Sequence, residues 1–64
     1  MTRAEKLNAL RRYVLAGRTD AVFDIRVGTV TFEDEVGQVS TTSDDLDRVR
    51  AEIAKEASDD QKNP

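Results

Sequence analysis

The chain is 64 residues long, carries a formal net charge of −3 and contains neither cysteine nor histidine. A chain of this length forms one small domain whose hydrophobic core lies near the lower limit for independent stability. Disulfide bonds and zinc sites built on cysteine or histidine are excluded, and the usual proton shuttle of enzymes is missing. Without such supports, oligomerisation or docking onto a larger assembly is favoured.

The charge is unevenly distributed along the chain. Residues 1–28 carry six basic and three acidic side chains, whereas residues 29–64 carry four basic and ten acidic ones. The overall negative charge disfavours general nucleic-acid binding, and the polarity suits a protein with two different neighbours. The alternative explanation is that both sets of charges simply face solvent. Apolar runs are far shorter than the roughly 20 residues that span a bilayer, and the N-terminus lacks a signal-peptide core, so we expect no membrane partner.

The first segment predicts an amphipathic helix over residues 3–16. Thr2 followed by Glu5 is a capping-box pattern, and Gly17 can adopt the left-handed conformation that ends a helix. The apolar positions of this helix follow one stripe: Leu7, Leu10 and Val14, with Tyr13 at its edge.

Residues 21–39 predict a β-hairpin, because apolar and polar side chains alternate along a stretch rich in β-branched and aromatic residues. One candidate turn lies at residues 27–28, and it would set Ile25 opposite Val30 and Phe23 opposite Phe32. Phe23, Ile25 and Phe32 are expected to be buried whichever turn forms.

A second candidate turn competes with the first. It lies at residues 35–37, and the strand that follows would then run from Gln38 to Thr41. With this turn, residues 21–27 and 29–34 are either two strands or one long bulged strand, because the apolar pattern changes parity at Gly28.

The last segment predicts a second helix over residues 43–57. Hydroxyl residues at 40–43 and two aspartates immediately after them form a strong start signal. The apolar stripe of this helix consists of Leu46, Val49, Ile53 and Ala57. The remaining residues, 58–64, form an acidic tail without a large apolar residue, and we expect this tail to be mobile.

Together these patterns predict an α+β fold in which two antiparallel helices pack with a β-hairpin, in the order helix, strand, strand, helix. The single domain covers residues 1–57. The expected core consists of Leu7, Leu10, Val14, Phe23, Ile25, Val30, Phe32, Leu46, Val49 and Ile53.

Catalysis finds little support in the residues. The acidic pair at 44–45 is explained by its place at a helix start, and the pair at 59–60 lies in the expected tail. Each glycine stands alone at an expected turn, so no phosphate-binding loop is present. We therefore expect a protein that is not an enzyme and that has no metal site and no cofactor.

The first helix carries four basic residues that are candidates for facing DNA or a larger protein: Lys6, Arg11, Arg12 and Arg18. They fan around the helix instead of forming one stripe, although a ring of many copies would multiply their effect. The alternative is that they only face solvent and complement the helix dipole.

The opening MTRAEKLNALRRYVLAG, the alternating hairpin and the Ser-Asp-Asp-Leu run before the last helix resemble the phage head-to-tail joining (head completion) protein W family. The likeness covers about residues 1–57. The matching residues are Met1, Thr2, Arg3, Glu5, Leu7, Leu15, Gly17, Phe32, Thr42, Ser43, Asp45, Leu46 and Ile53. The family's fold has two antiparallel helices and one two-stranded hairpin.

The resemblance implies a structural protein of the virion, made in the host cytoplasm and located at the head–tail junction. Its subunits would form a ring beneath the portal protein, help to retain packaged DNA through non-specific contacts, and provide the platform for the next neck or tail protein. The alternative is a small non-enzymatic interaction module or regulator of a phage or bacterium, and a more distant one is a DNA-binding regulator that uses the first helix.

The chain departs from the family in two places. The acidic tail replaces a basic and then apolar one, and the segment between Gly17 and Ser43 is longer than expected. If the added length extends the hairpin, its tip becomes a candidate contact with a neighbouring subunit. The tip residues are Glu33, Asp34, Glu35, Val36 and Gly37.

Overall fold

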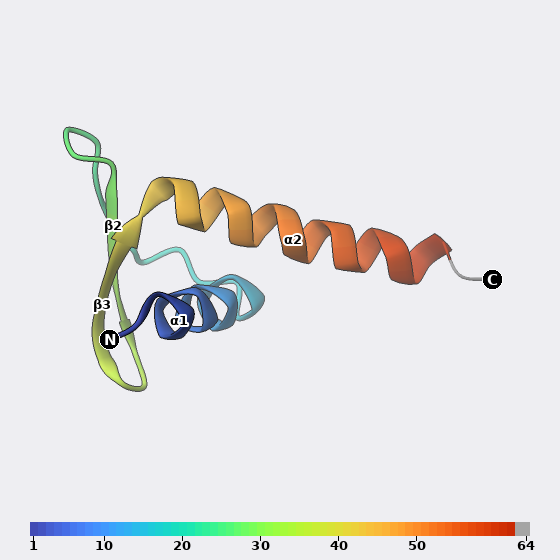
Figure 1. Cartoon of the computed structure of the whole chain (residues 1–64), viewed down its shortest axis with the longest axis horizontal. Helices are drawn as coiled ribbons and strands as arrows, with labels where there is room; N and C mark the ends of the chain where they lie inside the picture. Colours follow the sequence, from blue (N-terminus) through green and yellow to red (C-terminus); the bar gives the residue numbers. More distant parts are fainter. Residues whose placement is uncertain (63–64) are drawn as a thin grey trace.

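The computed structural model describes the backbone of residues 1–62 and the side chains of residues 1–58. Two helices flank one antiparallel sheet with the strand order β1-β2-β3, and both helices lie on the same side of the sheet (Figure 1). The predicted α+β class is confirmed. The elements in chain order are α1 (Arg3–Leu15), β1 (Val22–Asp24), β2 (Thr29–Asp34), β3 (Gly37–Thr42) and α2 (Ser43–Lys62).

Local capping fixes both ends of α1, as the sequence predicts. The Thr2 hydroxyl accepts a hydrogen bond from the Glu5 backbone N–H at 3.2 Å, and the Glu5 carboxylate accepts one from the Thr2 backbone N–H at 3.3 Å. Hydrogen bonds that the Thr2 backbone N–H and the Thr2 hydroxyl, the latter at 3.0 Å, donate to the Glu5 carboxylate hold the pKa of Glu5 below its ordinary value. At the other end, Gly17 adopts a positive φ of 69°, which reverses the chain after the helix.

The predicted hairpin is instead a three-stranded sheet, since both candidate turn regions reverse the chain. The β2–β3 turn has two residues, Glu35 and Val36, between Asp34 and its partner Gly37. The β1–β2 connection spans residues 25–28 and is not a two-residue turn. It therefore pairs Phe23 with Val30, and the predicted pairs Ile25–Val30 and Phe23–Phe32 are wrong.

The core lies between the sheet and the two helices, and side chains from all three contribute to it. The buried hydrophobic residues are Ala9, Leu10, Tyr13, Val30, Phe32, Val39, Leu46 and Val49, with Leu7, Val14, Ala21 and Ile53 packed against them. Most of the predicted core is therefore correct. Phe23 and Ile25 are the exceptions, because they are 52% and 94% exposed. They lie where β1 ends and the chain passes beyond the helices (Figure 1).

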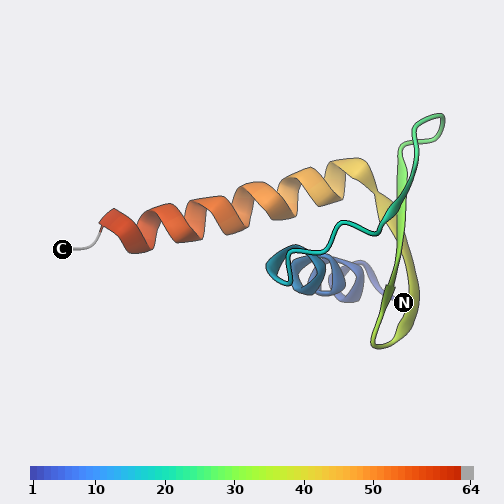
Figure 2. The same cartoon turned by 180° about the vertical axis from the view of Figure 1, so that it is seen from behind.

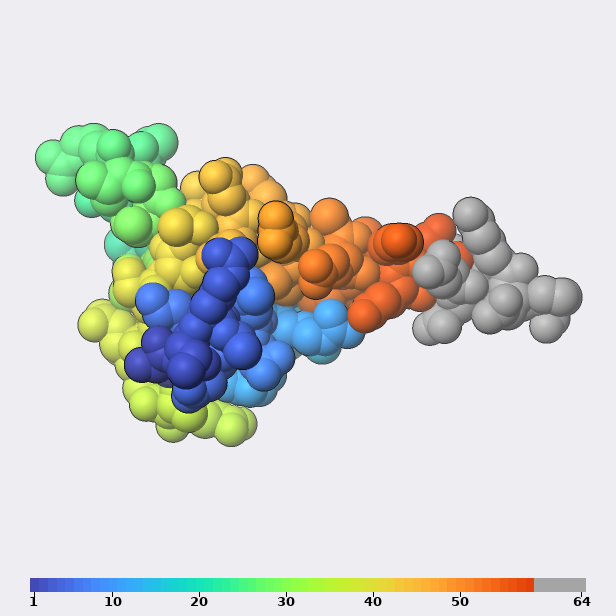
Figure 3. All heavy atoms as spheres, in the orientation of Figure 1, coloured from blue at the N-terminus to red at the C-terminus, as the bar shows by residue number. Residues whose placement is uncertain are grey.

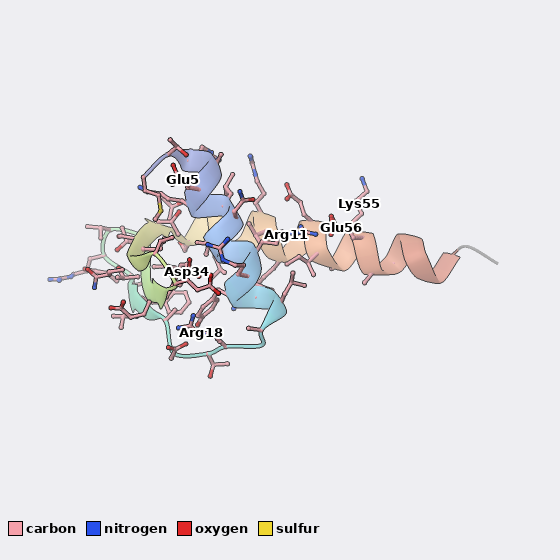
Figure 4. The ribbon with its side chains drawn as sticks, turned by 90° about the horizontal axis from the view of Figure 1, so that it is seen from below. Glu5, Arg11, Arg18, Asp34, Lys55 and Glu56 are labelled. Carbon is pink, nitrogen blue, oxygen red and sulfur yellow. The ribbon has the colours of Figure 1, made fainter. Side chains whose placement is uncertain are left out.

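The two helices cross obliquely and are not antiparallel, in contrast to the prediction. Arg3 at the start of α1 pairs with Asp45 at the start of α2 at 3.0 Å, and Arg11 further along α1 pairs with Glu56 further along α2. Figures 1 and 4 show α2 leading away from the sheet, whereas α1 lies beside the sheet and runs across the direction of α2.

Helix α2 is longer than predicted, since it continues past residue 57 to Lys62. Its second half leads away from the rest of the molecule (Figure 2), where the exposed positions need only helix propensity and not packing. Residues 58–62 of the predicted tail therefore extend the helix, and residues 63–64 lie outside the described residues. The mobility of the tail stays a prediction.

Candidate protein-interaction surface

The four predicted basic residues do not converge on one surface. Arg12 reaches across to β2, where its Nη2 atom lies 2.6 Å from Oδ2 of Asp34. The Asp34 side chain is only 5% exposed, and the hydrogen bond from Arg12 lowers its pKa despite the opposing effect of desolvation. The contact therefore ties the end of β2 to α1.

Arg18 is held by contacts on three sides. Its guanidinium donates to both carboxylate oxygens of Asp20, at 3.1 and 2.9 Å, and to the Glu33 carbonyl oxygen at 2.7 Å. It also lies 5.0 Å from the centre of the Tyr13 ring, within cation–π distance. Tyr13 in turn packs against Phe32 and accepts a hydrogen bond from the Ala21 N–H. Arg18 thus joins the loop after α1 to the sheet and the core.

The remaining two basic residues lie elsewhere on α1. Arg11 points toward α2 and Glu56, on the far side of α1 from Arg18 (Figure 4). Lys6 is partly buried and forms no ion pair with the described side chains. A continuous basic stripe that could follow a nucleic-acid backbone is therefore not formed by these four residues.

The predicted hairpin tip, residues 33–37, folds close to α1. Glu33 and Glu35 are exposed, whereas Asp34 is held by Arg12. Val36 is exposed and lines an open pocket of about 190 Å³. The other residues around this pocket are Met1, Glu5, Asn8 and Arg12. We call Glu33, Glu35, Val36, Met1 and Glu5 the acidic end of the molecule.

The largest group of exposed apolar side chains lies at the opposite end of β2. It is formed by β1 and the β1–β2 loop, which stand clear of the rest of the molecule in the space-filling view, in green (Figure 3). We call this group the apolar knob, and its residues are Val22, Phe23, Ile25 and Val27. An open pocket of about 310 Å³ adjoins it, lined by Phe23, Asp24, Ile25, Gly28, Thr29 and Ser43.

Backbone hydrogen bonds fix the knob to the start of α2. The Gly28 N–H donates to the Asp24 carbonyl oxygen at 2.8 Å, and the Ser43 N–H donates to the Gly28 carbonyl oxygen at 2.9 Å. Within the loop, the Arg26 N–H donates to the Asp24 carboxylate at 3.1 Å, as in an Asx turn. Gly28 has a positive φ of 70°, which glycine adopts without strain. The loop is thus a built feature that presents its apolar side chains in a fixed shape.

Sequence reasoning missed the knob because its alternation matches that of a half-buried strand. The available signal was the change of apolar parity at Gly28, which marks the point where the buried face begins. Among the side chains of residues 1–58, no group of three or more acidic, histidine or cysteine residues could hold a metal ion. No helix in the described part of the chain is long and apolar enough to cross a membrane.

The arrangement therefore offers surfaces for contact: an apolar knob at one end of β2 and an acidic end at the other. Comparisons with protein-family models, with curated proteins and with solved structures find no match for this chain.

Proposed function

We propose that this chain is a structural, non-enzymatic subunit of a phage head-to-tail connector. In this role it binds as a ring beneath the portal protein, helps to retain packaged DNA, and provides the attachment platform for the next neck or tail protein. The observation that carries the proposal is the apolar knob. A domain of this size has a small core, and the exposure of four large apolar side chains, two on β1 and two on the β1–β2 loop, favours a surface that another protein covers.

The resemblance noted in the sequence supports the same role, because the matching residues occupy structural positions. Thr2 and Glu5 form the capping box, while Phe32 and Leu46 belong to the core. In this proposal we equate the β2–β3 pair, flanked by two helices, with the family's hairpin. Strand β1 and the knob lie within the segment between Gly17 and Ser43 that is longer than expected. We therefore assign the contact surface to this longer segment.

A single subunit offers too few available basic residues to bind DNA by itself, so the proposed contact with packaged DNA requires many copies in a ring. Arg12 and Arg18 are engaged in contacts that hold the fold together, so each subunit would offer mainly Lys6, together with Arg11 once its exposed pair with Glu56 opens. A few such charges multiplied around a ring are enough for salt-dependent, sequence-independent contact with phosphates.

The proposal is tested by asking where the protein is located. Mass spectrometry of virions purified from the source of the sequence should detect the chain, and electron microscopy should place it as a ring at the portal. A protein that is absent from virions and binds a single host protein instead would refute the connector role. That outcome would support the second candidate, a small interaction module or regulator. The oblique helices and the third strand favour this candidate, because both features differ from the fold of the family.

A further inference from the structure

We propose that the apolar knob of one copy binds the acidic end of a second copy, in a head-to-tail contact. This inference deepens the proposed function, since it names the contact between neighbouring subunits of the ring.

The knob combines apolar surface with one positive charge. Ile25, at its tip, is the most exposed of its large apolar side chains. The neighbouring Arg26 side chain is 89% exposed, and its nearest acidic partner, Asp24, lies 3.5 Å away. An ion pair of this length and exposure contributes little, so Arg26 is free to approach a carboxylate on another molecule.

The acidic end has the complementary composition. Val36 and Met1 are its exposed apolar residues, and the adjoining pocket of about 190 Å³ has room for an aliphatic side chain such as Ile25. Glu35 directly precedes Val36, and Glu5 lines the pocket. Both are exposed and form no ion pair with the described side chains. The pocket lining thus holds two apolar residues and the Glu5 carboxylate, with Glu35 beside it, while the Arg12 guanidinium of the lining is paired with Asp34. This composition matches an apolar knob that carries an arginine.

The position of the two surfaces determines the kind of assembly. The β1–β2 loop of the knob precedes the first residue of β2, and Glu35 and Val36 of the acidic end follow its last residue, so the two surfaces lie at opposite ends of one strand. A contact between different surfaces of identical subunits is heterologous, and it closes into a ring when the rotation per subunit allows. A two-fold contact of knob with knob would instead bring Arg26 close to its own copy, which like-charge repulsion disfavours.

The absence of cysteine from the sequence allows a direct test of this contact. Ile25→Cys and Val36→Cys are prepared as two separate proteins, mixed at high concentration and oxidised, and the products are separated by mass. We expect cross-linked heterodimers in severalfold excess over a mixture of Ile25→Cys with Arg50→Cys, a control cysteine at an exposed position of α2. The protein with both Ile25→Cys and Val36→Cys should form a ladder of multimers or closed rings.

Two outcomes of this experiment would overturn the contact. Equal yields from the test and control mixtures would show that the knob and the acidic end do not meet. Efficient homodimers of Ile25→Cys alone would show a two-fold knob-to-knob contact instead. Circular dichroism spectra of all variants should match the spectrum of the unmodified protein, since the three substituted positions are exposed.

Charge reversal distinguishes the proposed ion pair between Arg26 and Glu35 from non-specific hydrophobic association. In the cysteine pair, Arg26→Glu alone should lower the cross-linking yield severalfold, and so should Glu35→Arg alone. Placing Arg26→Glu on the knob protein and Glu35→Arg on its partner should restore the yield, and failure to restore it would refute the pairing.

The test does not depend on the location of the protein in the cell. If the chain is part of the virion but the cross-link does not form, the head-to-tail contact is wrong and the connector role stands. If the cross-link forms but the chain is absent from virions, the contact stands and the connector role is wrong.

Discussion

The two phenylalanines of the sheet should respond to truncation in opposite ways, although they look alike in the sequence. Both stand in strands with alternating apolar residues, yet Phe32 is 4% exposed and Phe23 is 52% exposed. Phe32 also packs against Tyr13, with their ring centres 4.8 Å apart. The comparison therefore tests whether the apolar side chains of the sheet are exposed before Gly28 and buried after it.

The expected magnitudes follow from burial. Phe32→Ala removes a fully packed ring and should cost about 3–5 kcal/mol, comparable to the whole stability of a domain of this length, which is on the order of 3–10 kcal/mol. Phe23→Ala removes a ring that is already half hydrated, so its cost should be about 1–2 kcal/mol at most. Phe32→Leu keeps most of the volume and should cost below about 1.5 kcal/mol.

Thermal unfolding followed by far-ultraviolet circular dichroism measures these differences. Phe32→Ala should show no cooperative transition, or one at a much lower temperature, while Phe23→Ala and Phe32→Leu should retain cooperative unfolding close to that of the unmodified protein. Equal destabilisation by Phe23→Ala and Phe32→Ala would refute the placement of the knob outside the core. Near-normal melting of Phe32→Ala would refute the assignment of Phe32 to the core.

Three further predictions address the cap, the ion pair and the knob. Thr2→Ala removes the capping box of α1 and should lower the free energy of unfolding by about 1 kcal/mol, with an unchanged melting temperature as the contradicting result. Because the pKa of Asp34 is lowered in the folded state, its ionised form stabilises the protein above the ordinary value of 3.8, and this contribution is lost as the pH falls through the folded-state pKa. The Asp34→Asn variant should therefore be less stable than the unmodified protein at neutral pH and should lose less stability on acidification. Urea titrations at several pH values measure both effects. If the free energy of unfolding of the two proteins changes with pH in the same way, the ion pair of Asp34 with Arg12 does not have this role. Ile25→Ser combined with Val27→Ser should change monomer stability by no more than about 1 kcal/mol, since both side chains are exposed, and a large loss in the same titration would mean that the knob packs onto the domain.

The parts of the fold that the sequence predicts are those that depend on neighbouring residues. The start of α1 follows from Thr2 and Glu5, and the start of α2 follows from the hydroxyl and acidic residues around Ser43, because caps act within a few positions. The apolar stripes of both helices likewise predict which side chains pack inward.

The register of the sheet depends on distant contacts, and there the prediction fails. The alternation at Phe23, Ile25 and Val27 does not reveal whether a helix covers the apolar side chains or whether the strand extends past the helices. Only the position of α1 and α2 decides that Val39 is covered and that Ile25 is not. The apolar knob was not predicted for the same reason. The contacts of Arg12 and Arg18 also could not be predicted, because they depend on the approach of α1 to the end of β2, which no local pattern encodes.

The structure separates the contacts that stabilise the domain from the surface that we assign to binding. The ion pair of Arg12 with Asp34 and the packing of Arg18 on Tyr13 join α1 to one end of the sheet, while the knob lies beyond the other end. In a chain with so small a core, apolar side chains placed on a loop forgo the stabilisation of about 1.5–3 kcal/mol that each would gain by burial. Binding to a second protein recovers this free energy. Ile25→Ser combined with Val27→Ser should therefore abolish assembly while the domain remains folded, whereas loss of a core side chain such as Phe32 should abolish both together.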